Sequence, residues 1–288
     1  MNNYIIRYGE IALKGKNRRV FENILANNIS LYTKLRYGAE SNIVNIRGRL
    51  ILETEADVDL RPIFGLVSYS KAIKVEKDIE LIKEKAIEEF TKIKSPETFK
   101  VESHRLDKSF PIKTPEINRI VGEVIYEKFD IPVKMKNPNT LLGIEIHNTT
   151  AFIYVETIRG FGGLPLGCSD KVIVPLTNNR SILSALNLMR RGCKINFIGE
   201  KKELPLIKLY GSYKNPVFIN NKEDSEIITY ASPSHYKALD KKESFLMLYP
   251  IALLSDKEVE EELKKYELSA SVSSLATLQG KDDRPDGT

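Results

Sequence analysis

The fold is decided by residues 3–52, which read NYIIRYGEIALKGKNRRVFENILANNISLYTKLRYGAESNIVNIRGRLIL. The segment Asn3–Ile11 predicts a strand that enters a glycine-containing turn. Apolar residues then recur at the spacing of a helix face on which only Asn28 is polar, namely at Phe21, Ile24, Leu25, Ile29 and Tyr32. A strand followed by an amphipathic helix therefore opens the chain.

Two short apolar runs follow this helix. They cover residues 42–46 and 49–52 on either side of Arg47-Gly48, and they predict a hairpin or a bulged strand. A further strand is predicted over Val67–Val75. The order strand, helix, strand, strand is typical of a ferredoxin-like α+β sandwich.

A second unit is predicted from residue 78 onward. Residues 79–93 carry apolar side chains every three or four positions, which predicts an amphipathic helix, and the alternation in Phe99–Ser103 predicts a strand. Thr114-Pro115-Glu116 has the residue types that open a helix. Apolar runs at 142–146 and 151–155 predict a hairpin.

The pattern changes after the glycine-rich linker 160–167. A strand over 171–174, a helix over 181–191 and a strand over 194–198 form a βαβ opening, which predicts a parallel α/β sheet. Residues 256–266 predict a late surface helix.

We therefore expect α+β and α/β architecture in four segments. A ferredoxin-like domain would occupy residues 1–75, a second α+β domain 76–165 and a reduced α/β domain 166–268, followed by a tail without regular structure over 269–288.

Composition excludes several classes of protein. Of 288 residues, 42% are hydrophobic and 29% are charged. These are globular proportions. No apolar run approaches the roughly 20 residues of a membrane helix, and the N-terminus lacks a signal-peptide core. Cys168 and Cys193 cannot form a disulfide framework, and His104, His147 and His235 have no metal-ligand spacing. We expect a cytoplasmic protein without a metal site or membrane partner.

Charge is distributed unevenly along the chain. Residues 1–50 contain nine Lys/Arg against three Asp/Glu, whereas residues 251–288 contain five against nine. A basic N-terminal segment favours a polyanionic partner, and nucleic acid is the first candidate. The alternative is an ordinary lysine-rich solvated surface.

Phosphate-binding motifs are incomplete. In the linker, Cys168 stands where a P-loop has lysine, and Pro165 stands where a dinucleotide fingerprint has its third glycine. The loop after strand 171–174 is placed where α/β domains bind phosphate, but it contains no glycine. Its candidate nucleotide-binding residues are Thr177, Asn178, Asn179, Arg180 and Ser181. Asparagine tolerates left-handed backbone and Arg180 would pair with an anion; the alternative is a plain connection from strand to helix.

Five motifs occur in order along the chain: YGEIALKGKNR (8–18), FGLVSYSKA (64–72), RLDKSFP (105–111), PEIN (115–118) and GFGGLPLG (160–167). This series resembles the ThiI family, the tRNA 4-thiouridine synthetases or tRNA sulfurtransferases. The first four motifs are similar to its N-terminal ferredoxin-like domain and its THUMP RNA-binding domain. The resemblance implies that these domains grip the acceptor end of tRNA.

The resemblance also implies a third, PP-loop ATP-pyrophosphatase domain that adenylates uridine. The family sequence Ser-Gly-Gly-x-Asp-Ser falls on Leu176–Ser181, where only the final serine remains and an acid becomes Arg180. We therefore expect a degenerate PP-loop with no catalytic residue and no cofactor. Sulfur chemistry in the family uses cysteines and, in some members, a rhodanese domain, which we do not expect here; neither Cys168 nor Cys193 matches a family position.

The residues expected to contact RNA form two basic groups: Lys14, Lys16, Arg18 and Arg19, and Arg105, Lys108, Lys113 and Arg119. Tyr8 and Phe110 could stack on bases or pack in a core. The leading hypothesis is a tRNA-binding protein with a defective adenylation centre, working as a homodimer or with a separate catalytic or sulfur-donor subunit. One alternative is an active sulfurtransferase that uses ATP and Mg²⁺ in a rearranged site. Another is sulfur delivery to the thiamine thiazole.

Overall fold

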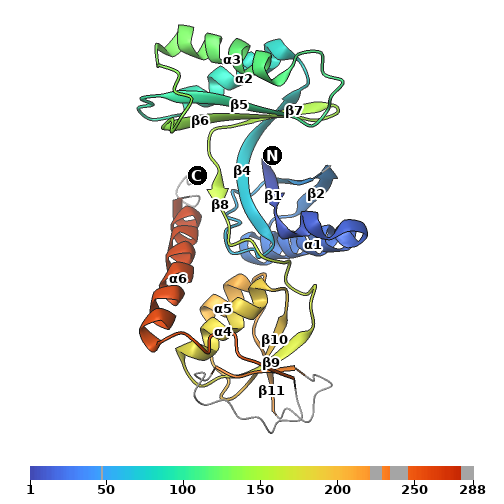
Figure 1. Ribbon diagram of the computed structural model, residues 1–288, viewed down its shortest axis with the longest axis vertical. Coiled ribbons are helices and arrows are strands. Elements are labelled where there is room, and N and C mark those ends of the chain that lie inside the picture. Colours follow the sequence, from blue (N-terminus) through green and yellow to red (C-terminus); the bar gives the residue numbers. More distant parts are fainter. Residues whose placement is uncertain (47, 221–228, 234–245, 280–288) are drawn as a thin grey trace, which may run out of the picture. The chain divides into compact units, whose positions relative to one another are not determined.

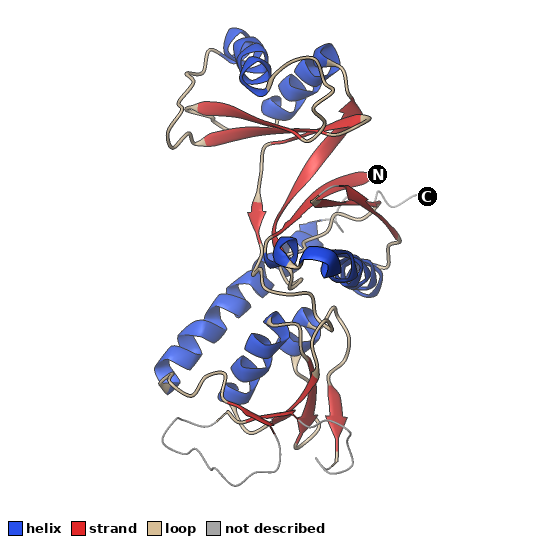
Figure 2. Ribbon diagram, turned by 45° about the vertical axis from the view of Figure 1, so that its right-hand side comes forward, coloured by secondary structure: helices blue, strands red, loops and turns tan. Residues whose placement is uncertain are grey.

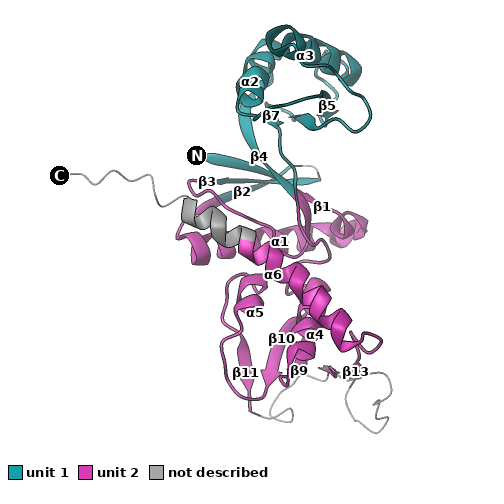
Figure 3. Cartoon of the chain, turned by 90° about the vertical axis from the view of Figure 1, so that its left-hand side faces the viewer, with its two compact units in different colours: residues 1–6, 42–54, 69–158 teal, residues 7–41, 55–68, 159–288 magenta. Residues whose placement is uncertain are grey.

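The computed structural model describes the whole chain except residues 47, 221–228, 234–245 and 280–288. Figure 1 labels its helices and strands. The backbone contacts divide the chain into two compact units, which are coloured separately in Figure 3. Unit 1 comprises residues 1–6, 42–54 and 69–158, and unit 2 comprises 7–41, 55–68 and 159–288. The units interleave in sequence because β1 and β4 each run from one into the other.

The strands of residues 2–159 belong to one sheet. Its order is β2-β3-β1-β4-β7-β6-β5, and β8 pairs with β4. Its strands are β1 (Asn2–Tyr8), β2 (Ser41–Ile46), β3 (Arg49–Thr54), β4 (Leu66–Glu76), β5 (Phe99–Arg105), β6 (Thr140–Ile146), β7 (Thr150–Tyr154) and β8 (Ile158–Arg159). Strands β1 and β3 are antiparallel, with Ile5 opposite Ile51. The strand expected within Asn3–Ile11 is confirmed as β1, and the glycine-containing turn that it was expected to enter begins at Gly9.

Within unit 1, helices α2 (Ile79–Thr91) and α3 (Thr114–Phe129) cover the same face of β5, β6 and β7 (Figure 2). Helix α2 begins where Asp78 accepts hydrogen bonds from two backbone amides, so its start follows directly from a capping residue. The helices bury Phe90 and Ile117 in one apolar cluster with Phe99. The expected elements of this part are confirmed.

The segment that connects β1 to the first long helix belongs to unit 2. Two short 3-10 turns, Glu10–Leu13 and Gly15–Asn17, lead into α1 (Arg18–Tyr37). The helix ends at Gly38 in the left-handed conformation, as glycine-terminated helices commonly do. The basic residues of the N-terminus thus lie on tight turns and on the first turn of a helix.

The third part of the chain, from residue 171 onward within unit 2, has a five-stranded parallel sheet. Its strand order is β11-β10-β9-β12-β13. Its strands are β9 (Lys171–Pro175), β10 (Lys194–Ile198), β11 (Val217–Ile219), β12 (Thr229–Ala231) and β13 (Leu246–Leu248). Helices α4 (Asn179–Arg190), α5 (Pro205–Tyr210) and α6 (Asp256–Gln279) pack together beside it (Figure 1). The parallel βαβ opening is confirmed, and with it the mixed α+β and α/β fold.

Helix α6 is longer than its sequence pattern indicates. The prediction of an irregular tail from residue 269 is wrong as far as Gln279, and residues 280–288 lie outside the described part. Near its middle, Tyr266 stacks on Phe161 with ring centroids 4.5 Å apart and lies edge-on to Tyr210. Burial accompanies this packing and raises the pKa values of both tyrosines. No helix of the described residues is both long and apolar enough to cross a membrane.

The glycine-rich linker is held against the C-terminal end of α4. The amide of Leu164 donates to the carbonyl of Arg190 at 2.9 Å, and the amide of Gly167 donates to that of Gly192 at 2.7 Å. Gly163 has φ +78°, and a Cβ there would lie 2.3 Å from the carbonyl oxygen of Arg190. Glycine is therefore required by both conformation and space, which explains the linker composition without a bound phosphate.

We expect Gly163→Ala to lower the free energy of unfolding by about 3 kcal/mol or more, because it adds a backbone clash to the penalty of left-handed backbone. Gly38→Ala is the matched control: Gly38 also has positive φ, +66°, but a Cβ there meets nothing within 4 Å. It should cost only about 1 kcal/mol. Urea unfolding followed by circular dichroism measures both, and equal losses would contradict the steric argument.

Candidate nucleic-acid interface and nucleotide loop

In the first basic group, some side chains bond to other groups of the protein, and others are exposed and available to a ligand. Arg18 donates to Glu22 at 2.7 Å and to the hydroxyl of Tyr8 at 2.8 Å, and the Tyr8 hydroxyl also donates to Glu22. Burial, helped by Glu22, raises the pKa of Tyr8 to about 12. Tyr8 is only 8% exposed, so its ring packs in the interior and is not placed to stack on a base.

The remaining cations of this group face outward to different extents. Lys14 is half-buried, with its ammonium 4.9 Å from the centroid of the Phe21 ring. Lys16 and Arg19 are exposed, and within the described residues neither makes an ion pair or a side-chain hydrogen bond. These two are the available cations of the first group.

The second basic group lies in unit 1 and divides in the same way. Arg105 donates to the carbonyls of Phe110 and Ile112 at 2.8 and 2.9 Å, so it holds the loop that follows β5. Phe110 is buried under that loop at 5% exposure, which removes it as a stacking platform. Arg119 pairs with Glu123 at 3.0 Å, with both side chains more than half exposed. Such pairs are weak and exchange readily with other anions.

Lys108 and Lys113 are exposed, and neither has a charged partner in the described part of the chain. The neighbouring Asp107 is already neutralised: Lys77 lies 2.6 Å away, and this hydrogen bond, with those from Ser109, holds the pKa of the carboxyl well below its usual range. The loop therefore presents two lysines beside a carboxylate whose charge is internally balanced.

The loop after β9 satisfies its own backbone amides. The amide of Thr177 donates to the Ser181 hydroxyl at 3.0 Å, and the amides of Arg180 and Ser181 donate to the side-chain and backbone oxygens of Asn178, each at 3.0 Å. Asn178 is extended and caps α4, and neither Asn178 nor Asn179 has the left-handed backbone considered from the sequence. Three amides that a phosphate would need are thus already bonded.

Arg180 points into the protein. Its guanidinium donates to the carbonyls of Pro233, Leu254 and Ile251 at 2.8, 3.0 and 3.1 Å, and it pairs with Asp256 at 2.9 Å. Arg180 is only 8% exposed, whereas the side chain of Asp256 is 78% exposed. Arg180 is therefore an internal cross-link. The sequence identified Arg180 as a candidate anion-binding residue but could not show where its guanidinium points.

The two cysteines lie near each other at the end of the linker and the start of β10. A Cβ on Gly192 would lie 2.4 Å from the Cys168 sulfur, and Cys193 follows directly. Burial, then the neighbouring Cys168, raises the pKa of the Cys193 thiol. A raised pKa lowers the thiolate fraction at neutral pH and so disfavours nucleophilic sulfur chemistry. The described residues contain no cluster of metal-ligating side chains.

Two family models match the chain. The model of the ThiI ferredoxin-like domain matches residues 3–70, and that of the THUMP domain matches residues 76–156. Together they cover the part in which the two basic groups lie.

Relatives and solved structures agree with these matches. A probable tRNA sulfurtransferase of Brevibacillus brevis is 37% identical over an alignment of 203 residues that covers 67% of this chain but only 50% of that protein. The chain thus spans half of this relative's length. PH1313 of Pyrococcus horikoshii superposes with a TM-score of 0.80 at 28% identity over 92% of this chain and 99% of that one. A 4-thiouridine synthetase in complex with RNA and ATP superposes with a TM-score of 0.77 at 22% identity, over 93% and 86%.

We expect Arg180→Ala to lower the free energy of unfolding by about 3 kcal/mol, since it leaves three carbonyl groups without their donor. Asp256→Asn should lower it by less than about 1 kcal/mol, because a carboxylate that lies mostly in solvent contributes little to an ion pair. Thermal and urea unfolding compare the two variants. If Arg180→Ala were as stable as the parent protein, the guanidinium would not be an internal cross-link.

Proposed function

Because this chain belongs to the ThiI family, we propose that it binds tRNA through its ferredoxin-like and THUMP domains and holds the acceptor end. The observation that carries the proposal is the set of exposed cations without described partners in both matched domains: Lys16, Arg19, Lys108 and Lys113. Cations of this kind neutralise RNA phosphates and release counterions, which is the main source of affinity for a polyanion.

The other members of the two basic groups have supporting roles in this proposal. Arg18 and Arg105 shape the turn and the loop that carry the available cations, since each donates to groups of its own chain. Arg119 can exchange Glu123 for a phosphate at a small cost in free energy, because both side chains are exposed and such ion pairs are weak. Lys14 contributes positive potential from its position over Phe21.

We further propose that the adenylation centre is defective. Three amides of the loop Leu176–Ser181 are bonded within the loop, and Arg180 is committed to carbonyls of the same domain. A cavity of about 440 Å³ does lie beside the start of α4. Glu203 and Glu267 line it together with Lys202, so the charge of its wall does not favour a triphosphate.

The alternative is an active tRNA sulfurtransferase with ATP and Mg²⁺ in a rearranged site. The specific observation in its favour is the shared fold with a 4-thiouridine synthetase that has ATP bound. It would require Arg180 and the loop amides to exchange their present partners for phosphate oxygens. Sulfur delivery to the thiamine thiazole would in addition need a reactive cysteine, and the raised pKa of Cys193 argues against that residue.

Replacing Lys16, Arg19, Lys108 or Lys113 by alanine should each weaken tRNA binding about 3- to 10-fold at low salt and reduce the log–log salt slope by about 1. Filter binding or gel shift with full-length tRNA over a salt series measures both. Lys264→Ala removes an exposed positive charge from α6 and is the matched control. Unchanged affinity in all four variants, with the parent thermal stability, would rule out these residues as the RNA-binding surface.

For the nucleotide loop, calorimetric titration with ATP and Mg²⁺ should show no binding up to millimolar concentrations, because the loop amides that would donate to a phosphate are already bonded. Protein supplied with tRNA, ATP and a sulfur donor should produce no thiolated tRNA. ATP binding that is lost in Arg180→Lys would instead favour the active enzyme. Since the tRNA-binding variants are tested without nucleotide, the two parts of the proposal can fail separately.

A further inference from the structure

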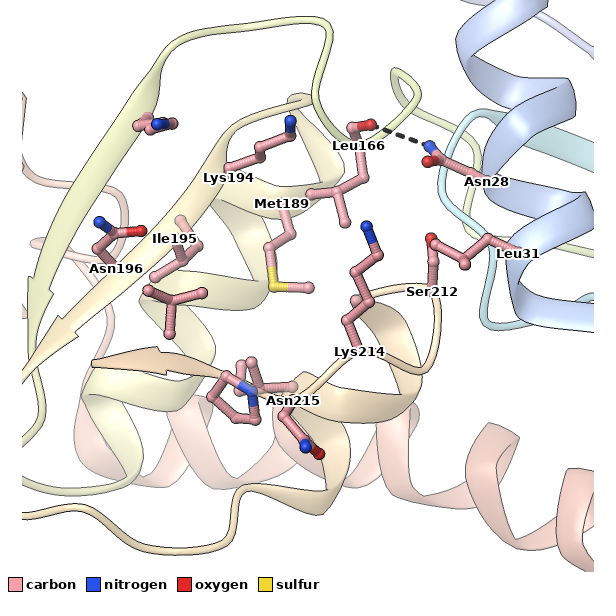
Figure 4. A pocket seen from close by; sticks show the side chains of 15 residues that line it. Asn28, Leu31, Leu166, Met189, Lys194, Ile195, Asn196, Ser212, Lys214 and Asn215 are labelled. Atoms are coloured by element: carbon pink, nitrogen blue, oxygen red, sulfur yellow. Dashed lines mark hydrogen bonds between the residues drawn. The ribbon is translucent and has the colours of Figure 1, made fainter. Parts of the chain in front are cut away.

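A second pocket lies in unit 2 at the edge of the parallel sheet where strands β9, β10 and β11 begin (Figure 4). The loop Leu176–Ser181 follows the other end of β9, so this pocket is separate from the nucleotide loop of the family. We call it the amino-edge pocket and define it by Met189, Ile195, Ser212 and three lysines, Lys171, Lys194 and Lys214. Its volume is about 350 Å³. That volume lies at the lower end of the range for small-molecule sites.

The three lysines come from three separate segments. Lys171 and Lys194 are the first residues of β9 and β10 and are paired across the sheet, and Lys214 precedes β11. No acidic residue lines the pocket, and within the described part of the chain none of the three ammonium groups has a carboxylate partner. Positive charges gathered in this way repel one another until an anion lies between them.

The protein leaves space for one of these lysines. A Cβ on Gly167 would lie 2.8 Å from Cε of Lys194, and Gly167 has φ +92°. The linker glycine therefore allows the Lys194 methylenes to cross the backbone. The Lys194 side chain therefore passes close to the linker at Gly167.

The rim of the pocket contains two residues with strained backbone, which contacts of the Tyr213 ring hold in place. Ser212 and Tyr213 are consecutive non-glycine residues with φ +57° and +63°. This conformation costs a non-glycine residue about 1–2 kcal/mol. The Tyr213 ring lies edge-on to Tyr32 of α1 with centroids 6.3 Å apart, and the Arg36 guanidinium carbon lies 5.6 Å from the centroid of the Tyr213 ring. These contacts offset the strain, and they fix Ser212 and Lys214 on either side of Tyr213.

The floor and the polar groups restrict the ligand further. Met189 and Ile195 supply an apolar floor, and Lys214 extends into the space between Met189 and Ser212 (Figure 4). Asn196 and Asn215 add amide groups, which can bond to the edge of a heterocycle. The matching ligand is small, carries an anion at one end and has a flat body with polar edges.

We propose that the amino-edge pocket binds a mononucleotide, with its phosphate among Lys171, Lys194 and Lys214 and its base over Met189 and Ile195. The nucleotide is either free or a terminal residue of an RNA chain, since both present the same chemistry. The phosphate screens three positive charges, and the base covers apolar surface next to the two asparagine amides.

The test uses the full chain with methyl-¹³C methionine. The four methionines are Met1, Met135, Met189 and Met247, so the Met189 methyl signal reports on this pocket and the other three are internal controls. AMP and an acceptor-stem RNA minihelix are titrated separately. Both ligands should shift the Met189 signal, because both present the same chemistry. Free nucleotide as the source predicts saturation at a lower concentration of AMP than of the minihelix, whereas an RNA terminus as the source predicts the reverse order.

The lysines are then replaced together as Lys171→Ser, Lys194→Ser and Lys214→Ser, which should weaken binding about 30-fold or more. Lys94→Ser, Lys136→Ser and Lys264→Ser together remove the same charge from positions that are exposed elsewhere on the chain. This control should leave the affinity within about 2-fold, because distant exposed charges are screened by salt. No movement of Met189 with either ligand would overturn the proposal. A shift that survives the triple pocket variant would overturn it as well.

Discussion

A buried guanidinium is the constraint around which the third part of the chain is arranged. Arg180 is only 8% exposed. Because a guanidinium cannot be deprotonated in a protein, its burial requires acceptors for its donors. The acceptors are carbonyls of Pro233, Ile251 and Leu254, which belong to the segments before and after β13. Helix α4 is thereby tied at its first turn to segments far along the chain. A loop held in this way is a structural element, which is the basis for the proposal that it no longer binds a triphosphate.

The C-terminal end of α4 is held by contacts with the glycine-rich linker and with the turn after β1. The carbonyl of Arg190 accepts from Leu164, and Gly163 lies so close to it that no side chain would fit. Arg191 adds an ion pair to Glu10 at 2.9 Å, which joins the same helix end to the turn after β1. The motifs 8–18 and 160–167 therefore both bond to the same helix end in unit 2. The glycines of the linker 160–167 resemble phosphate-binding motifs in the sequence, but the close packing at Gly163 explains why glycine is needed there.

The division of the cations follows from the same principle of satisfied partners. Arg18 lies next to Glu22, which is 6% exposed, and Arg105 donates to two carbonyls, so both are used by the fold. The exposed Lys16, Lys108 and Lys113 have no such partners among the described residues, and this is why the proposal assigns them to RNA. Arginine, with five donors in a plane, is the residue that can serve several buried acceptors at once. This distinction sorts the candidates for RNA contact more sharply than charge density does.

Local pattern was sufficient for most of the chain. The capping Asp78, the proline near the start of α3 and the alternation in Phe99–Ser103 predicted elements that are confirmed, because caps and periodicity act over a few residues. The ordered motifs predicted the ThiI family, which is also confirmed. The strand that enters a turn at a glycine is confirmed by β1 and Gly9. The end of the last helix was not predicted, because α6 continues past Tyr266 although its apolar pattern does not.

What the amino-acid sequence determined by itself is thus the order of elements, the family and the absence of glycine from the loop 176–181. Tertiary structure alone decided that Arg180 faces inward and that Lys171, Lys194 and Lys214 share one pocket. The reason is physical: partners that are far apart in sequence come together only when sheet register and helix packing have placed their backbones. No local pattern contains that information.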